Sequence, residues 1–189
     1  FVALAAAMAG ATALTSCGSD DNDIITPATK KVVAGNIKVS AQFSEDVIKC
    51  CDISLVYTDD QGQEQKISAA SMPLKDTIIT TGSREKIKQH NIKICEIVKE
   101  WKNLPLPTTK KYHFTCDLKD NLPAKDTIVL YRNISEFTAH SYNDGTTDKY
   151  FIGNMFISSG EESLESFTNE TRFTNYQKFL KRESTVTVE

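Results

Sequence analysis

Short segments in which apolar and polar residues alternate follow one another through most of the chain. Residues 36–43, with the sequence NIKVSAQF, and residues 51–58, with the sequence CDISLVYT, show the pattern most clearly. A period of two places one side of a β-strand against a core and the other in solvent. On the same grounds, further strands are expected at residues 65–68, 77–81, within 91–101, and at 112–118, 127–131, 149–157 and 184–188.

Turn-forming residues separate these segments. Residues 59–62 (DDQG) and 142–145 (YNDG) are typical of hairpin turns. One helix is expected, at residues 175–182, where Thr174 and Gln177 match a capping box and the apolar residues share a face.

Repeated short strands with a single helix predict an all-β fold, an antiparallel β-sandwich with one short C-terminal helix. An immunoglobulin-like strand arrangement is one form that this sandwich could take, and an open barrel is the alternative. We expect one such domain over residues 35–189. With 40% hydrophobic residues among 189, the chain is able to bury a core. The net charge of −3 and the absence of a basic block exclude the electrostatic footprint of a nucleic-acid-binding protein.

The first residues have a different composition. Residues 1–14 (FVALAAAMAGATAL) are uncharged, match the apolar core of a signal peptide, and are too short for a membrane-spanning helix. They lead into Leu14-Thr15-Ser16-Cys17, which resembles the bacterial lipobox. The resemblance implies a signal peptide over residues 1–16, a lipid on Cys17 and a flexible tether over residues 17–34.

Acidic residues follow the lipobox cysteine. Residues 18–23 (GSDDND) resemble the export signal of surface lipoproteins of the Bacteroidota, where such residues direct the protein to the outer face of the outer membrane. That resemblance implies a small outer-membrane lipoprotein anchored at the cell surface through its lipid. The alternative is a plain acidic linker on a lipoprotein that faces the periplasm and supports envelope assembly.

Four further cysteines lie in the body of the chain, at positions 50, 51, 95 and 116. An even number in an exported protein is compatible with disulfides. Alternation puts Cys50 and Cys51 on opposite faces, whereas Cys51 and Cys116 each lie on an apolar face, so a bond between these two across the sheets is expected. Its spacing resembles the immunoglobulin disulfide, although the tryptophan and corner tyrosine of that family are missing. Buried free thiols are the alternative.

Motifs for catalysis, cofactors or metals are absent from the sequence. The three histidines, His90, His113 and His140, occur in unrelated contexts, and no nucleophile elbow, phosphate loop or zinc spacing is present. We therefore expect no enzyme activity, no cofactor and no metal. The alternative is an enzyme whose active site is not recognisable from the sequence. The favoured function is a binding, adhesion or accessory module for a glycan or protein ligand, with Trp101 as a candidate stacking surface for a sugar.

Two short motifs suggest modification. Asp76-Thr77-Ile78 and Asp126-Thr127-Ile128 resemble the O-glycosylation motif of exported Bacteroidota proteins, which implies glycans on Thr77 and Thr127. A glycan requires that the threonine is accessible, and either residue is excluded if it begins a buried strand.

Overall fold

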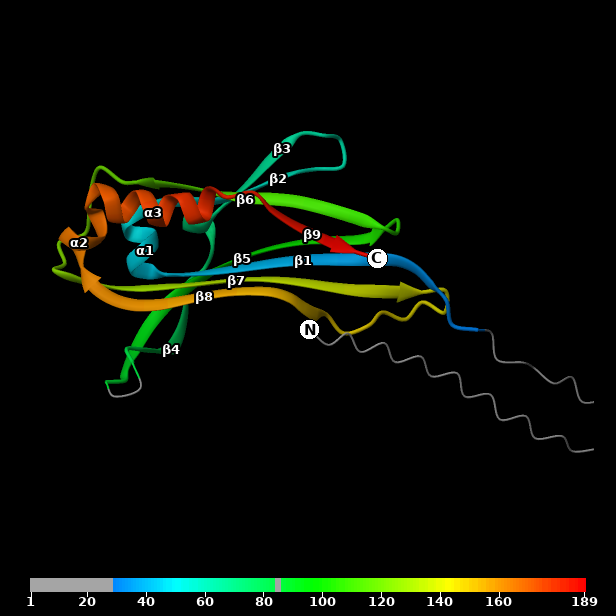
Figure 1. The fold of residues 1–189 in the computed structure, drawn as a ribbon, viewed down its shortest axis with the longest axis horizontal. Helices are drawn as coiled ribbons and strands as arrows, with labels where there is room; N and C mark the ends of the chain where they lie inside the picture. The colour runs from blue at the N-terminus through cyan, green and yellow to red at the C-terminus, as the bar shows by residue number, and fades with distance from the viewer. Residues whose placement is uncertain (1–28, 84–85) are drawn as a thin grey trace, which may run out of the picture.

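The alternating segments pair into two antiparallel sheets that pack face to face (Figure 1). The computed structural model describes residues 29–83 and 86–189. One sheet has the order β4 (Lys75–Thr81), β5 (Lys88–Leu104), β1 (Val32–Ser44), β7 (Thr127–Tyr142), β8 (Phe151–Ser163). The other has the order β3 (Glu64–Ser68), β2 (Cys51–Thr58), β6 (Thr108–Leu118), β9 (Ser184–Val188). The predicted β-sandwich is confirmed.

The strand order differs from that of an immunoglobulin domain. There the first two strands pair in one sheet. Here β1 pairs with β5 and β7 in the five-stranded sheet, while β2 pairs with β3 and β6 in the other. The sandwich therefore does not have the immunoglobulin strand order.

Three helices connect the sheets: α1 (Glu45–Cys50), α2 (Leu164–Thr168) and α3 (Glu170–Lys181), with a 3-10 turn, η1, at Ala69–Ser71. The expected C-terminal helix is present as α3 but begins earlier, because the Asn169 side chain accepts a hydrogen bond from the Thr171 amide and caps it. The capping box at Thr174 and Gln177 was wrong, since Gln177 instead donates to the carbonyl of Cys116 at 2.6 Å. Among the described residues, no helix is long and apolar enough to span a membrane.

The core lies between the two sheets and is closed at one end by α1, α2 and α3 (Figure 1). Phe43 of β1 meets Phe114 of β6 edge to face, with ring centres 5.8 Å apart, and both are fully buried. Phe167 of α2 packs against Tyr176 of α3, with ring centres 5.3 Å apart. Every residue of this core falls between positions 37 and 188, so we expect residues 29–189 to fold on their own.

The ordered domain begins before residue 35. β1 starts at Val32, and the amide of Lys31 donates to Oδ1 of Asn143 at 2.9 Å. The last part of the expected tether is therefore a strand. The signal peptide, Cys17 and the acidic cluster lie outside the described residues, and their roles stay predictions.

Candidate functional site: a cleft beneath the edge strand β8

The histidines occupy separate places. His90 Nε2 lies 2.8 Å from Oγ1 of Thr81, and His140 Nε2 lies 2.7 Å from the carbonyl oxygen of Glu189. His113 lies opposite Val56 in the β2–β6 pair. Over residues 29–83 and 86–189, no three His, Cys, Asp or Glu side chains are placed to hold a metal ion.

The four body cysteines are buried and carry free thiols. The expected bond across the sheets was wrong, because Cys51 and Cys116 lie on neighbouring strands of one sheet, where Cys51 faces Leu118 and Cys116 faces Ile53. Contact with Cys116, together with burial, raises the pKa of the Cys51 thiol. Cys50 is also buried, because it ends α1 instead of alternating along a strand.

Trp101 belongs to the core. Its side chain is 5% exposed and packs edge to face against Tyr57, with ring centres 5.7 Å apart. An indole that stacks on a sugar must present its face to solvent, so the role of Trp101 as a ligand-stacking residue was wrong.

The two glycosylation motifs lie at the beginnings of strands in the five-stranded sheet. Thr127 is the first residue of β7 and is exposed, whereas Thr77 of β4 is half-buried. Modification stays a prediction at both, and the geometry is more favourable at Thr127.

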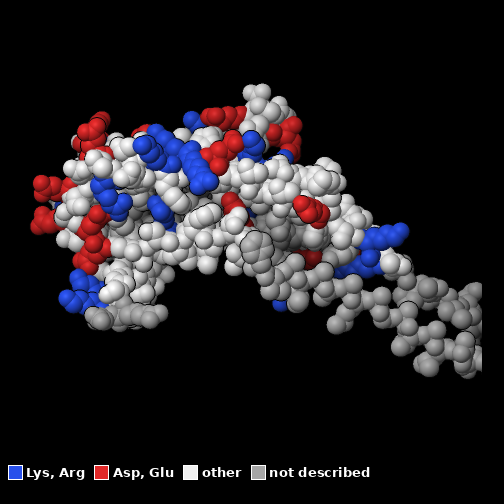
Figure 2. All heavy atoms as spheres, viewed as in Figure 1, with Lys and Arg blue, Asp and Glu red and all other residues white. Residues whose placement is uncertain are grey.

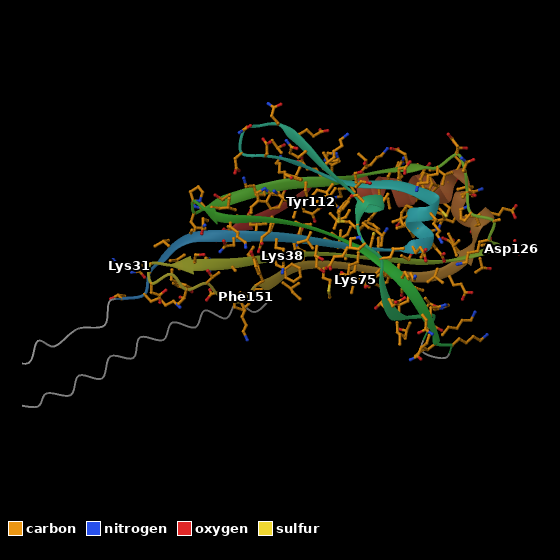
Figure 3. The ribbon with its side chains drawn as sticks, turned by 180° about the vertical axis from the view of Figure 1, so that it is seen from behind. Lys31, Lys38, Lys75, Tyr112, Asp126 and Phe151 are labelled. Atoms are coloured by element: carbon orange, nitrogen blue, oxygen red, sulfur yellow. The ribbon has the colours of Figure 1, made fainter. Side chains whose placement is uncertain are left out.

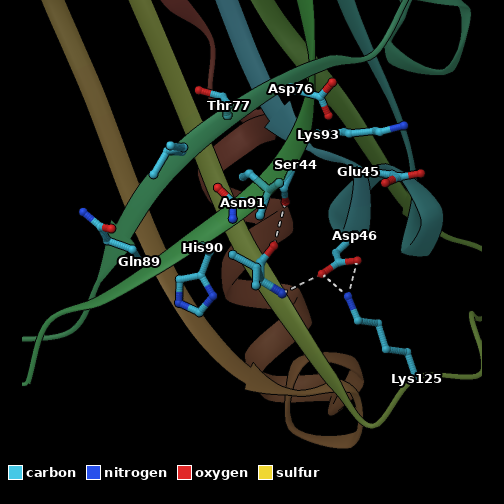
Figure 4. A pocket seen from close by; sticks show the side chains of 13 residues that line it. Ser44, Glu45, Asp46, Asp76, Thr77, Gln89, His90, Asn91, Lys93 and Lys125 are labelled. Carbon is cyan, nitrogen blue, oxygen red and sulfur yellow. Dashed lines mark hydrogen bonds and ion pairs between the residues drawn. The ribbon is translucent and has the colours of Figure 1, made fainter.

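A wide polar hollow lies between the β4–β5 hairpin, α1 and the start of β7 (Figure 4). Its volume is about 870 Å³. Asp46 pairs with Lys125 at 2.7 Å and accepts a hydrogen bond from the amide of Val129 at 2.8 Å, while Ser44 donates to the carbonyl of Val129 at 2.7 Å. These bonds fasten α1 to β7. Apart from the His90 imidazole, no aromatic ring lines the hollow, so it offers no stacking surface for a sugar.

A smaller cleft opens between β8 on one side and α3 and β9 on the other, and we call it the β8–α3 cleft. Its volume is about 360 Å³. Phe156 of β8 and Phe179 of α3 form its apolar wall, with ring centres 6.1 Å apart. Tyr112 of β6 and Glu136 of β7 also line it, so the cleft reaches the interior of the sandwich.

Glu136 is a carboxylate buried inside this cleft. Its side chain is 2% exposed. Oε1 accepts a hydrogen bond from the Tyr112 hydroxyl at 2.7 Å, and Oε2 accepts one from Nδ2 of Asn154 at 2.5 Å. In the part of the chain that the structure describes, no Lys, Arg or His side chain forms an ion pair with it. A buried charge without a counter-charge is costly, and two neutral donors leave part of the acceptor capacity of the carboxylate unused.

Glu136 affects the pKa of a neighbouring hydroxyl group, and charged side chains lie near the cleft. Burial, then the hydrogen bond to Glu136, raise the pKa of the Tyr112 hydroxyl above its usual range. At the mouth of the cleft, Arg182 and Glu183 are exposed, and Glu183 pairs with Lys111 at 2.9 Å. Arg132 lies further along β7 and stacks on Phe179, with its guanidinium carbon 3.7 Å from the ring centre.

The alternation of apolar residues could have predicted that Glu136 lies inside the sandwich, but the strand was expected to end before this residue. Alternation from Ile128 through Leu130 and Ile134 continues to position 136, so a strand extended to Tyr142 places this glutamate inside. The expected strand ended at residue 131 and left Glu136 unassigned.

Figure 2 shows lysine and arginine side chains interspersed with aspartate and glutamate over the visible face, without a large basic area. Comparison with models of protein families, with curated proteins and with solved structures found no match.

Proposed function

We propose that the protein is a lipid-anchored lipoprotein of the outer membrane, displayed at the cell surface, that acts as a non-catalytic binding module through the β8–α3 cleft. The anchor rests on the lipobox at Cys17 and the display on the acidic residues after it. The binding role is carried by one observation, the buried carboxylate of Glu136 in a cleft with one apolar wall, with hydrogen bonds only from neutral donors.

The geometry favours one class of ligand, a cationic ammonium or guanidinium group on an apolar stem. The cation neutralises Glu136 and uses its remaining acceptor positions, while the stem packs against Phe156 and Phe179. A lysine or arginine side chain of a partner protein has this chemistry. A neutral sugar lacks the charge, so a protein ligand is favoured over a glycan.

Phenethylamine, an ammonium group on an aromatic stem, is a suitable probe for the cleft. It is titrated into residues 29–189, and the NMR signal of the Asn154 side-chain amide, which donates to Glu136, is followed. We expect saturable shifts in the wild type. Because a charge-assisted hydrogen bond is worth about tenfold or more in affinity, Glu136→Gln is expected to weaken binding at least about tenfold.

A matched control separates the buried carboxylate from general attraction by acidic residues. Glu183→Gln removes one negative charge at the mouth of the same cleft and is expected to leave binding nearly unchanged. Phenethyl alcohol tests the wild type without any substitution and is expected to bind at least about tenfold more weakly than the amine. Equal binding of the alcohol and the amine, or no binding of the amine, overturns the cleft as a cation site.

Surface display is tested on intact cells of the native organism. Protease treatment is expected to remove the protein from whole cells, and Cys17→Ala is expected to release it from the membrane fraction. Protection from protease in whole cells, with digestion after the outer membrane is opened, instead supports a lipoprotein that faces the periplasm.

A further inference from the structure

Arg132 is a charged residue on the face of β7 that meets the core. It follows the buried Ile128 and Leu130 on this face, because side chains two positions apart in a strand point the same way. The side chain is half-buried, and its Nε is buried without a hydrogen-bond partner. Among the residues that the structure describes, no Asp or Glu forms an ion pair with it. A guanidinium in this position is costly unless an anion accompanies it.

The ring of Phe179 holds this guanidinium in place. The guanidinium carbon of Arg132 lies 3.7 Å from the ring centre, so the ring covers one side of the group. Stacking on an aromatic ring leaves the nitrogens at the edge of a guanidinium able to donate hydrogen bonds. Little conformational freedom is therefore lost when an acceptor binds.

A small pocket adjoins this guanidinium, and we call it the Arg132 pocket. Its volume is about 50 Å³, and Ser158 of β8 and both Arg172 and Tyr176 of α3 line it together with Arg132. Ser158 lies opposite Arg132 in the β7–β8 pair, so the two side chains share a face of the sheet. Arg172 and Tyr176 are one helical turn apart and share a face of α3. Two guanidinium groups and two hydroxyl groups therefore meet at this pocket.

The hydroxyl of Tyr176 is a second buried donor without a partner in the described residues. The residue is 6% exposed, and its hydroxyl makes no hydrogen bond. Burial raises the pKa of this hydroxyl, so it stays protonated and able to donate at neutral pH. Buried polar groups in folded proteins nearly always have a partner. An acceptor in the pocket supplies one to the hydroxyl of Tyr176 and to Nε of Arg132.

The second arginine is partly neutralised by a carboxylate that lies outside the pocket. Nε and Nη2 of Arg172 donate to Glu162, with a shortest distance of 2.8 Å. No Asp or Glu side chain lines the pocket itself. Burial, and to a lesser extent the nearby charge of Arg172, lower the pKa of Arg132, so the two cations lie close to each other. The pocket therefore has a net positive charge.

We infer that the Arg132 pocket binds one compact oxyanion, a phosphate or sulfate group. The edge nitrogens of arginine match the oxygens of such groups. The donors come from three elements, β7, β8 and α3, and a tetrahedral group directs oxygens toward all three, whereas a carboxylate is planar. The volume is far below the roughly 300 Å³ at which pockets for whole small molecules begin, so one such group fills it. Ser158 and Arg172 are exposed and open the pocket to solvent.

Sulfate added to residues 29–189 tests the pocket, with chloride at equal ionic strength as the comparison. The chain has four arginines, so the NMR signals of their Nε groups are few, and those of Arg132 and Arg172 are followed. We expect saturable shifts with sulfate and none with chloride. Arg132→Met keeps an apolar side chain against Phe179 and removes the donors. It is expected to weaken sulfate binding at least about tenfold, measured at Arg172.

Two further variants separate the pocket from general attraction by basic residues. Lys178→Met is the matched control, because it removes one positive charge from an exposed position of α3 outside the pocket and is expected to leave binding nearly unchanged. Tyr176→Phe keeps the ring and removes the hydroxyl. It is expected to weaken sulfate binding about threefold to tenfold and to leave the domain folded, since this hydroxyl has no partner in the described residues.

Glucose 6-sulfate distinguishes a group on a larger ligand from a free ion. Tighter binding of the sugar sulfate than of inorganic sulfate supports a sulfated or phosphorylated ligand, and the reverse order supports a free ion. Equal shifts with chloride and sulfate, shifts that do not saturate, or unchanged sulfate binding by Arg132→Met overturns the oxyanion site. The site is independent of the β8–α3 cleft, because the two share no lining residue and the amine is followed at Asn154.

Discussion

Tyr112 shows how a single hydroxyl group supports a buried charge. The residue is 2% exposed, and its hydroxyl donates to Glu136 at 2.7 Å. Tyr112→Phe keeps the ring and removes the donor, so Glu136 is left with Asn154 alone. Leaving a buried charged group short of a partner costs about 1–3 kcal/mol, and we expect a loss of that size in the free energy of unfolding, measured with urea.

The neighbouring strand supplies a control for this substitution. Tyr57 lies opposite Tyr112 in the β2–β6 pair and packs against Trp101. Tyr57→Phe is expected to change stability by less than about 0.5 kcal/mol. Equal effects of the two substitutions would show that Tyr112 acts through its ring and not through Glu136.

The reactivity of the thiols also depends on their local surroundings. Burial raises the pKa of Cys50 and Cys95, and contact with Cys116 raises that of Cys51. A raised thiol pKa means less reactive thiolate at neutral pH. We expect native residues 29–189 to resist a thiol reagent at pH 7 and to react at four sites when unfolded without reductant. Two unreactive thiols after unfolding would reveal a disulfide.

At the scale of elements, the two sheets are held closely together where β1 passes β9. A side chain built on Gly35 of β1 would lie 2.5 Å from Cγ1 of Val188 in β9 and 2.7 Å from Cδ2 of Leu106. Gly35→Ala therefore forces these core residues apart and is expected to destabilise the fold by about 1–3 kcal/mol. Thermal or urea unfolding measures the change.

Gly160 of β8 is the matched control, because a side chain added there meets nothing within 4 Å. Gly160→Ala is expected to be neutral or slightly stabilising, since alanine restricts the unfolded chain. A similar loss in both variants would mean that strand conformation, and not contact with Val188, requires glycine.

The sequence predicted those elements whose pattern is local. Strands β2 and β9 have the expected limits because alternation and turn residues mark both ends. The six residues of α1 were missed, since one and a half turns show no helical period between two strands. β7 was expected to end at residue 131 because Arg132 and Glu136 interrupt its apolar face. The cleft was missed for the same reason, since pairing across β6, β7 and β8 assembles it.

At the scale of the whole molecule, the sandwich is elongated and its two ends differ. Figure 3 places Lys31, near the start of the described chain, at one end and Asp126 at the other. α2 and the connection from β6 to β7 lie at the end that carries Asp126 (Figure 1). The proposed lipid on Cys17 precedes Lys31 in the chain. Such an anchor would hold the end with Lys31 toward the membrane and present the opposite end, with Thr127, outward.

This orientation makes a prediction for the displayed protein. Asn121→Cys introduces a thiol at the outer end, and Thr29→Cys introduces one near the anchor; both positions are exposed, while the native body thiols are buried. On intact cells, a bulky polyethylene-glycol maleimide is expected to label position 121 severalfold faster than position 29, because the membrane and its polysaccharides obstruct the inner end. After extraction in detergent the two rates should converge. Equal rates on cells would mean that the domain tumbles freely on its tether, and faster labelling at position 29 would reverse the orientation.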